Sequence, residues 1–199
     1  MILLYRYNSY IYKNYNGRGV SKIMSSLQKF HRRTMSLGTV TWPATSIGMG
    51  DATHGYWLGD ISTNKLIVAP KSTDFFGEWG SYGTTRGTVS TTNGLANTNT
   101  LAGFGQAAHP AAYYCKNLTT GGYNTWYLPA KDELTTLYAN KAATPFATAN
   151  SFDGAYHVSS TEANAANFWE RDFATGNQNS SFNNKARSRY ARAVRRSTI

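Results

Sequence analysis

Cysteine, charge and long apolar runs are all scarce in this sequence. The one cysteine among 199 residues, Cys115, excludes an intrachain disulfide framework and a zinc site built on cysteines. Charged side chains make up only 15 % of the chain, against roughly 25 % in an average soluble domain, so Asn, Thr, Ser, Gly and Tyr must cover the surface. No apolar run approaches the ~18 residues of a membrane-spanning helix, and residues 1–4 are too short an apolar start for a signal peptide. We therefore expect no membrane insertion.

The charge that is present lies mainly at the two ends of the chain. Hydrophobic residues make up 41 % and aromatic residues 14 %, enough for a real core, so global disorder is excluded. The net charge is +10, but residues 1–40 hold seven bases and residues 184–199 hold six, with no acid in either segment. The part between them holds seven bases and ten acids. Basic ends of this kind indicate either a polyanionic partner or solvated tails, and composition leaves both open.

Residues 1–37 differ from the remainder and are predicted to form a basic, Tyr-rich assembly arm. Apolar residues between Ser21 and Met35 have near-helical spacing. The segment is too small and too basic to form its own core, so we expect it to dock on the body of the chain or on a neighbouring chain. The candidate assembly residues are Tyr5, Arg6, Tyr7, Tyr10, Tyr12, Arg18, Lys22, Arg32 and Arg33.

Residues 38–199 are predicted to form one body of mixed strands and helices, an α+β fold. Helices are expected at 110–118, where Pro110 begins the first turn, and at 130–140. The Gly-, Thr- and Asn-rich residues 71–106 are expected to form ordered loops. Turn-flanked segments rich in β-formers predict strands at residues 39–42, 56–58, 65–69, 156–159, 166–173 and 190–196.

Patterns for catalysis or metal binding are scarce. The four histidines share no metal-ligand spacing, and Ser159-Ser160 lacks the G-x-S-x-G pattern of a nucleophile elbow. The adjacent carboxylates Asp132 and Glu133 are explained by their place at a helix start. Cys115 lies on the apolar stripe of the first helix and is expected to be an inert buried thiol. We therefore predict a protein that is not an enzyme and holds neither a cofactor nor a metal.

A set of motifs in the second half of the chain carries a family resemblance. In order, they are Trp126-Tyr127-Leu128-Pro129 with Glu133-Leu134, Ser159-Ser160-Thr161-Glu162, Phe168-Trp169 with Phe173 and Gly176, and Tyr190-Ala191-Arg192 with Val194-Arg195-Arg196. Residues 110–196 thereby resemble the C-type-lectin-like module found at the end of bacterial collagen-like adhesins and in phage fibre and tail proteins. That family has Thr or Ser where this chain has Ala130, so the capping box with Glu133 is expected to be incomplete.

The resemblance implies a C-type-lectin-like fold, with two helices packed on small antiparallel sheets and long ordered loops. It further implies a phage virion protein, a fibre, tail or head-decoration subunit whose lectin-like domain points outward toward a host-surface glycan or protein. Its partners would be other virion proteins and copies of itself, in a trimer or higher homo-oligomer. Large apolar side chains are expected to anchor the core, namely Trp126, Leu128, Trp169 and Phe173.

Recognition is expected on the loops that this scaffold presents. Residues 177–185 are dense in amides and hydroxyls around one aromatic ring, a composition typical of adaptable binding loops, although such residues also solvate long turns. Lys185 and Arg187 are expected to contact a neighbouring subunit instead. The candidate ligand-binding residues are Trp169, Glu170, Arg171, Asn177, Gln178, Asn179, Ser180, Phe182 and Asn183.

Three other functions compete with this interpretation. An oxidase of the formylglycine-generating type shares the fold family, but such enzymes hold copper with paired cysteines, which a single cysteine does not supply. A nucleic-acid-binding role for the basic ends ranks behind, because no helix–turn–helix, zinc or RNA-recognition motif is present. A calcium-dependent lectin is disfavoured because the Glu-Pro-Asn and Gln-Pro-Asp triplets are absent.

Overall fold

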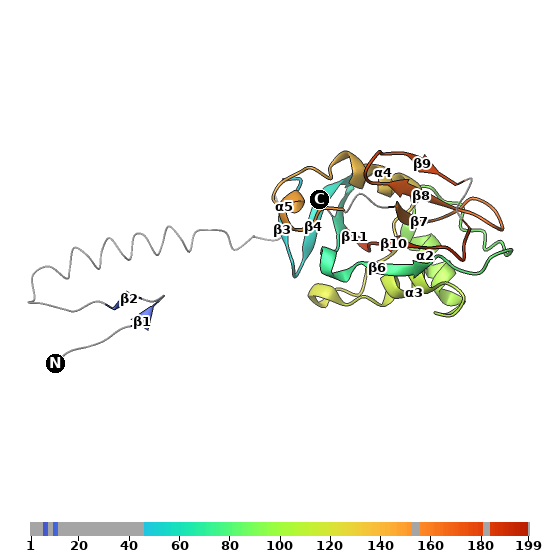
Figure 1. Cartoon of the computed structure of the whole chain (residues 1–199), viewed down its shortest axis with the longest axis horizontal. Helices are drawn as coiled ribbons and strands as arrows, with labels where there is room; N and C mark the ends of the chain where they lie inside the picture. Colours follow the sequence, from blue (N-terminus) through green and yellow to red (C-terminus); the bar gives the residue numbers. More distant parts are fainter. Residues whose placement is uncertain (1–5, 8–9, 12–45, 153–155, 181–183, 199) are drawn as a thin grey trace, which may run out of the picture. The chain divides into compact units, whose positions relative to one another are not determined.

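The computed structural model describes residues 6–7, 10–11, 46–152, 156–180 and 184–198 (Figure 1). The chain divides into two units, Met1–Thr41 and Trp42–Ile199. In the first unit, β1 (Arg6–Tyr7) pairs antiparallel with β2 (Tyr10–Ile11), and three predicted assembly residues lie on this pair. The other assembly residues, the helical spacing at 21–35 and the strand predicted at 39–42 lie outside the described residues.

A four-stranded antiparallel sheet in the second unit has the strand order β11-β5-β4-β3. β4 and β5 form the hairpin predicted from the segments 56–58 and 65–69, and Ser62 makes its tight turn with a φ of 55°. The last strand, β11, pairs with β5 and so brings the C-terminal residues against this hairpin. The four strands are β3 (Gly50–Asp51), β4 (Gly55–Ile61), β5 (Asn64–Val68) and β11 (Val194–Thr198).

A five-stranded sheet has the order β6-β10-β7-β8-β9. All neighbouring strands in it are antiparallel except β10 and β7, which are parallel. The strands predicted at 156–159 and 166–173 are confirmed as β7 and β8. The five strands are β6 (Phe75–Glu78), β7 (Tyr156–Glu162), β8 (Phe168–Asp172), β9 (Gln178–Asn179) and β10 (Ser188–Ala191).

The prediction of one closing strand over 190–196 is wrong, because the chain changes sheets inside it. β10 ends at Ala191 in the five-stranded sheet, and β11 begins at Val194 in the four-stranded sheet. Between them, Arg192 is buried and its guanidinium binds the Asp74 carboxylate and, at 2.6 Å, the Asn150 carbonyl. A buried charge needs such partners, so they determine the course of the backbone at this crossing.

Both predicted helices are confirmed, as α3 (Pro110–Asn117) and α4 (Lys131–Ala139). A short helix, α5 (Phe146–Ala149), and two 3₁₀ turns, η1 (Lys71–Thr73) and η2 (Thr120–Gly122), complete the connections. Helix α3 packs against β6, where Phe75 stacks on Tyr114 with ring centroids 5.0 Å apart (Figure 1). No helix in the described part of the chain has the length and apolarity to span a bilayer.

The expectation that residues 71–106 form only loops is wrong, because they include β6 and the helix α2 (Gly94–Gly103). The α2 sequence is rich in Asn, Thr and Gly, which are poor helix formers. Tertiary contacts compensate: Asn93 caps the helix by accepting from the Ala96 amide, and the Thr98 hydroxyl exchanges hydrogen bonds with the Leu128 backbone at 3.0 and 3.1 Å. Leu128 lies 30 residues from Thr98 along the chain, so local propensity did not reveal the helix.

The core confirms most of the expected anchors. Trp126, Leu128 and Phe173 are buried, and Cys115 is a buried free thiol whose pKa is raised by burial, which agrees with an inert role. The prediction that Trp169 anchors the core is wrong. Its side chain is half-buried, while the preceding residue, Phe168, is buried and stacks on Trp79 with centroids 5.7 Å apart. Successive side chains of a strand point to opposite faces, so only one of these two rings can enter this core.

Candidate binding surface

Buried ion pairs hold the C-terminal basic segment inside the domain. Lys185 is fully buried and its ammonium contacts the Glu162 carboxylate, so the expectation that Lys185 contacts a neighbouring subunit is wrong. Arg196 and Arg189 bind Glu133 and Glu170, each at 2.8 Å. With Arg192, four bases of this segment therefore have internal acidic partners. Their charge is compensated within the fold and contributes little to a polyanion-binding surface.

The start of α4 is held by its own Glu133 and by residues from two other segments. Ala130 has no side-chain oxygen, so only half of the capping box exists: the Glu133 carboxylate accepts from the Ala130 amide at 2.8 Å. Two other free amides of the first turn find acceptors elsewhere in the fold: the Thr161 hydroxyl accepts from the Lys131 amide at 3.0 Å, and the Thr91 carbonyl accepts from the Asp132 amide at 2.8 Å. The helix start is thereby fixed next to β7, which positions Lys131.

The turn between β8 and β9 is built around Asp172. Its carboxylate accepts from the Ala174 amide and the Thr175 hydroxyl, each at 2.8 Å. Burial alone would raise the pKa of Asp172, but these hydrogen bonds outweigh it and lower the pKa. Gly176 follows with a φ of 84°, and a Cβ at this position would lie 2.6 Å from the Tyr138 ring, so glycine is required here. These contacts fix the conformation of the turn and so the position at which β9 begins.

The predicted ligand-binding residues do not form one surface. Glu170 and Arg171 are buried: Glu170 binds Arg189, and burial raises its pKa. Arg171 donates to the Gly176 carbonyl and the Thr135 hydroxyl at 2.8 and 2.7 Å. Both side chains therefore support the hairpin. Asn177 is exposed, Gln178, Asn179 and Ser180 are half-buried, and Phe182 and Asn183 lie outside the described residues.

Strand register decides which of the half-buried residues face the same way. Gln178 lies opposite Arg171, and Asn179 lies opposite Glu170. Opposite residues of an antiparallel pair share a face, so Gln178 lies on the face of Trp169 and Arg171, and Asn179 lies on the other. The structure brings Gln178 to Trp169 and separates Asn179 from it.

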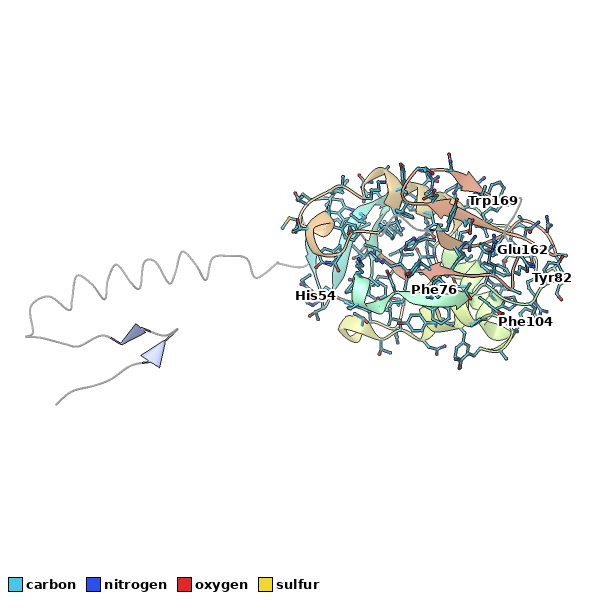
Figure 2. The ribbon with its side chains drawn as sticks, in the orientation of Figure 1. His54, Phe76, Tyr82, Phe104, Glu162 and Trp169 are labelled. Atoms are coloured by element: carbon cyan, nitrogen blue, oxygen red, sulfur yellow. The ribbon has the colours of Figure 1, made fainter. Side chains whose placement is uncertain are left out.

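One residue that the sequence did not single out completes this face. The Lys131 ammonium lies 3.8 Å from the centroid of the Trp169 ring, and the Lys131 carbonyl accepts from the Gln178 amide at 2.8 Å. We call Lys131, Trp169 and Gln178 the Trp169 surface; Figure 2 shows where Trp169 lies on the domain. Lys131 is 38 residues from Trp169 in sequence, and only its place after the Leu128-Pro129 motif hinted at a role.

The Trp169 surface combines a half-buried indole ring, an ammonium group and a side-chain amide. Such a set offers an apolar face with hydrogen-bond donors and an acceptor at its edge, which suits binding more than bond-making chemistry. Among the described residues, no three His, Cys, Asp or Glu side chains are grouped so that they would hold a metal ion.

Comparison with known proteins assigns the family. The family described as Lcl C-terminal domain matches residues 79–195, more than half of the chain. The chain therefore belongs to this family, which is a C-type-lectin-like domain family found in phage and bacterial proteins. No curated protein matches the chain. The family resemblance inferred from the motifs is thus confirmed.

Proposed function

We propose that this chain is a non-enzymatic structural and binding protein of a phage particle. In this proposal residues 38–199 form an outward-facing lectin-like domain that binds a host-surface glycan or protein, and residues 1–37 assemble the subunit into a fibre, tail or head decoration. Membership of a lectin-like family supports an adhesin-type role. The fold by itself does not define a ligand, so the argument for binding rests on the site.

The observation that carries the proposal is the half-buried Trp169 ring with Lys131 and Gln178 at its edge. A rigid aromatic ring supplies a large contact area at low entropic cost, and nearby amide and ammonium groups select a ligand by its hydrogen bonds. The ring is carried by β8, between β7 and β9, and is not on a free loop. A ligand would therefore meet a surface that is already formed.

A double substitution tests this role. Trp169→Ala with Gln178→Ala should abolish adsorption of the particle to its host, while the melting temperature of the purified full chain falls by only a few degrees. The matched control is Trp57→Ala, since Trp57 is also half-buried and also carries a lysine, with the Lys65 ammonium 4.3 Å from its ring centroid. Adsorption that survives the double substitution, or that is lost equally in the control, would contradict the proposal.

The assembly role of residues 1–37 is tested separately. Deleting them should leave residues 38–199 folded, with the same circular dichroism, but unable to join the particle or the homo-oligomer. Normal assembly of the truncated chain would refute the proposed arm. Receptor binding by the isolated truncated chain would stay intact, so the two halves of the proposal fail independently.

A further inference from the structure

A second surface pair, distant in sequence from the Trp169 surface, is formed by Arg86 and Phe104. The guanidinium carbon of Arg86 lies 4.0 Å from the centroid of the Phe104 ring, and its Nε donates to Nε2 of His109 at 3.0 Å. His109 is fully buried, and burial together with the nearby Arg86 charge lowers its pKa to about 4. The imidazole is therefore neutral near pH 7, and its Nε2 lone pair accepts the hydrogen bond that Arg86 Nε–H donates.

The backbone beneath Arg86 is held by a buried carboxylate. The amides of Arg86 and Gly87 donate to Glu162 at 2.9 Å, and Lys185 pairs with the same carboxylate and donates to the Thr84 carbonyl at 2.7 Å. The negative charge of Glu162 is compensated by Lys185, so it does little to neutralise the positive charge of Arg86. Among the described residues no acidic side chain forms an ion pair with Arg86.

The loop that carries Arg86 also has exposed apolar side chains. Phe104 is 50 % exposed, and Tyr82 and Val89, on the same loop as Arg86, are 60 % and 68 % exposed. The Ser81 amide donates to the Ala108 carbonyl at 2.9 Å, which holds the loop against the connection between α2 and α3. Figure 2 places Tyr82, Phe104 and Glu162 at one end of the domain. The Arg86 guanidinium is thus held over a half-exposed ring, on a loop that has two further exposed apolar side chains.

We propose that Arg86 and Phe104 bind a carboxylate carried next to an apolar side chain on a partner protein. With Nε held by His109, the two outer nitrogens of the guanidinium remain to form parallel hydrogen bonds to a carboxylate. The half-exposed Phe104 ring then packs against the apolar neighbour of that carboxylate. A nucleic acid would need several cations spaced along its phosphates, and residues 79–93, the loop that carries Arg86, contain one. The site does not depend on the host receptor proposed above.

The carboxylate has two possible sources, a chain terminus or an acidic side chain, and small probes distinguish them. The full chain is titrated by NMR with N-acetylphenylalanine against its amide, and with acetyl-Phe-Asp-amide against acetyl-Phe-Asn-amide. At least one acid should bind with a Kd of about 1 mM, and at least tenfold more tightly than its neutral counterpart. Whichever acid binds more tightly identifies the source. Equal binding of acid and neutral probes, or equally tight binding of inorganic phosphate, would overturn the proposal.

Variants locate the binding on the proposed residues. Arg86→Gln should weaken the acid probe about tenfold, while Lys116→Gln, which removes the same charge from an exposed position bound to Asn99, should change it less than twofold. Phe104→Leu keeps an apolar surface but removes the ring, and should weaken binding about threefold. Trp169→Ala should have no effect, which separates this site from the Trp169 surface. Equal losses in Arg86→Gln and Lys116→Gln would show attraction by net charge alone and would overturn the site.

Discussion

Arg86 and Lys131 each place a cation over an aromatic ring at the surface, but the structure restrains the two cations to different degrees. The Arg86 guanidinium is bound by His109 and lies over Phe104, and its backbone amide is bound by Glu162. Lys131 is held only through its backbone, while its ammonium reaches Trp169 on four rotatable bonds. The Arg86 guanidinium is therefore fixed by side-chain contacts, whereas the Lys131 ammonium is free to change its conformation.

This difference teaches how support behind a surface group shapes what the group can bind. A guanidinium that is already held in place loses little conformational entropy when a ligand arrives, so it favours one ligand geometry. An ammonium on a flexible side chain adapts to ligands of different shape. The Arg86 region is therefore suited to one chemical group, and the Trp169 surface to contacts of mixed kind.

The largest expected effect comes from removing the support of the Arg86 loop. Glu162→Gln removes the negative charge that compensates the buried Lys185 ammonium, and we expect the free energy of unfolding to fall by about 3–5 kcal/mol. Urea denaturation of the full chain measures this loss. Glu78→Gln, on the exposed position of β6, is the control and should change stability by less than about 0.5 kcal/mol. A loss below about 1 kcal/mol in Glu162→Gln would show that the pair does not hold the loop.

The Trp169 surface is tested by comparing the stability cost of removing a buried and a half-buried tryptophan ring. Trp126 is 1 % exposed, so Trp126→Ala should cost about 3–5 kcal/mol, whereas Trp169→Ala should cost only about 1 kcal/mol because its ring is half-buried. Denaturation of both variants under one set of conditions tests the contrast. Equal losses would return Trp169 to the core and remove it as a binding surface.

His109 makes the Arg86 region sensitive to acid. Its pKa is about 4 in the folded chain, with burial as the main cause and the Arg86 charge second, and about 6.5 when unfolded. As the pH falls, the unfolded state therefore binds the proton before the folded state does. The contribution of His109 to the free energy of unfolding is fully present above pH 6.5, and roughly 1–3 kcal/mol of it is lost as the pH drops toward 4. Measured against pH, the unfolding free energy of His109→Gln should lack this part of the slope. A variant with the wild-type slope would assign the acid sensitivity to other groups.

The smallest effect tests how Lys131 is positioned. The Thr161 hydroxyl accepts from the Lys131 amide and donates to the Ser90 carbonyl, so Thr161→Val should cost about 1–2 kcal/mol by leaving both groups without that partner. Thermal unfolding measures the change, with Thr125→Val at an exposed site as the control. If the two variants melt alike, the start of α4 is held by Glu133 and Thr91 alone.

Much of the fold follows from local patterns. The β4–β5 hairpin has turn residues between two β-rich segments, and α3 and α4 begin at Pro110 and after Pro129 with apolar residues at helical spacing. Helix α2 was not predicted because it is rich in poor helix formers, and hydrogen bonds with Leu128 that help to hold it are not visible in its own sequence. Composition suggested the loop 177–185 as a binding site, which stays a prediction. It did not suggest Lys131 or Arg86, since nothing near them in sequence marks their aromatic partners.

The sequence by itself determined the α+β class, the family motifs and the apolar residues available for the core, because these depend on residue type and short spacing. Tertiary structure decided which of Phe168 and Trp169 faces the core, since a two-residue period leaves the choice of face to the sheet. It also decided the fate of the basic C-terminal segment: Lys185 meets Glu162 across 23 residues, and Arg192 meets Asp74 across 118. The energy of a charge depends on its distance to other charges and on its burial, and both are properties of the folded chain.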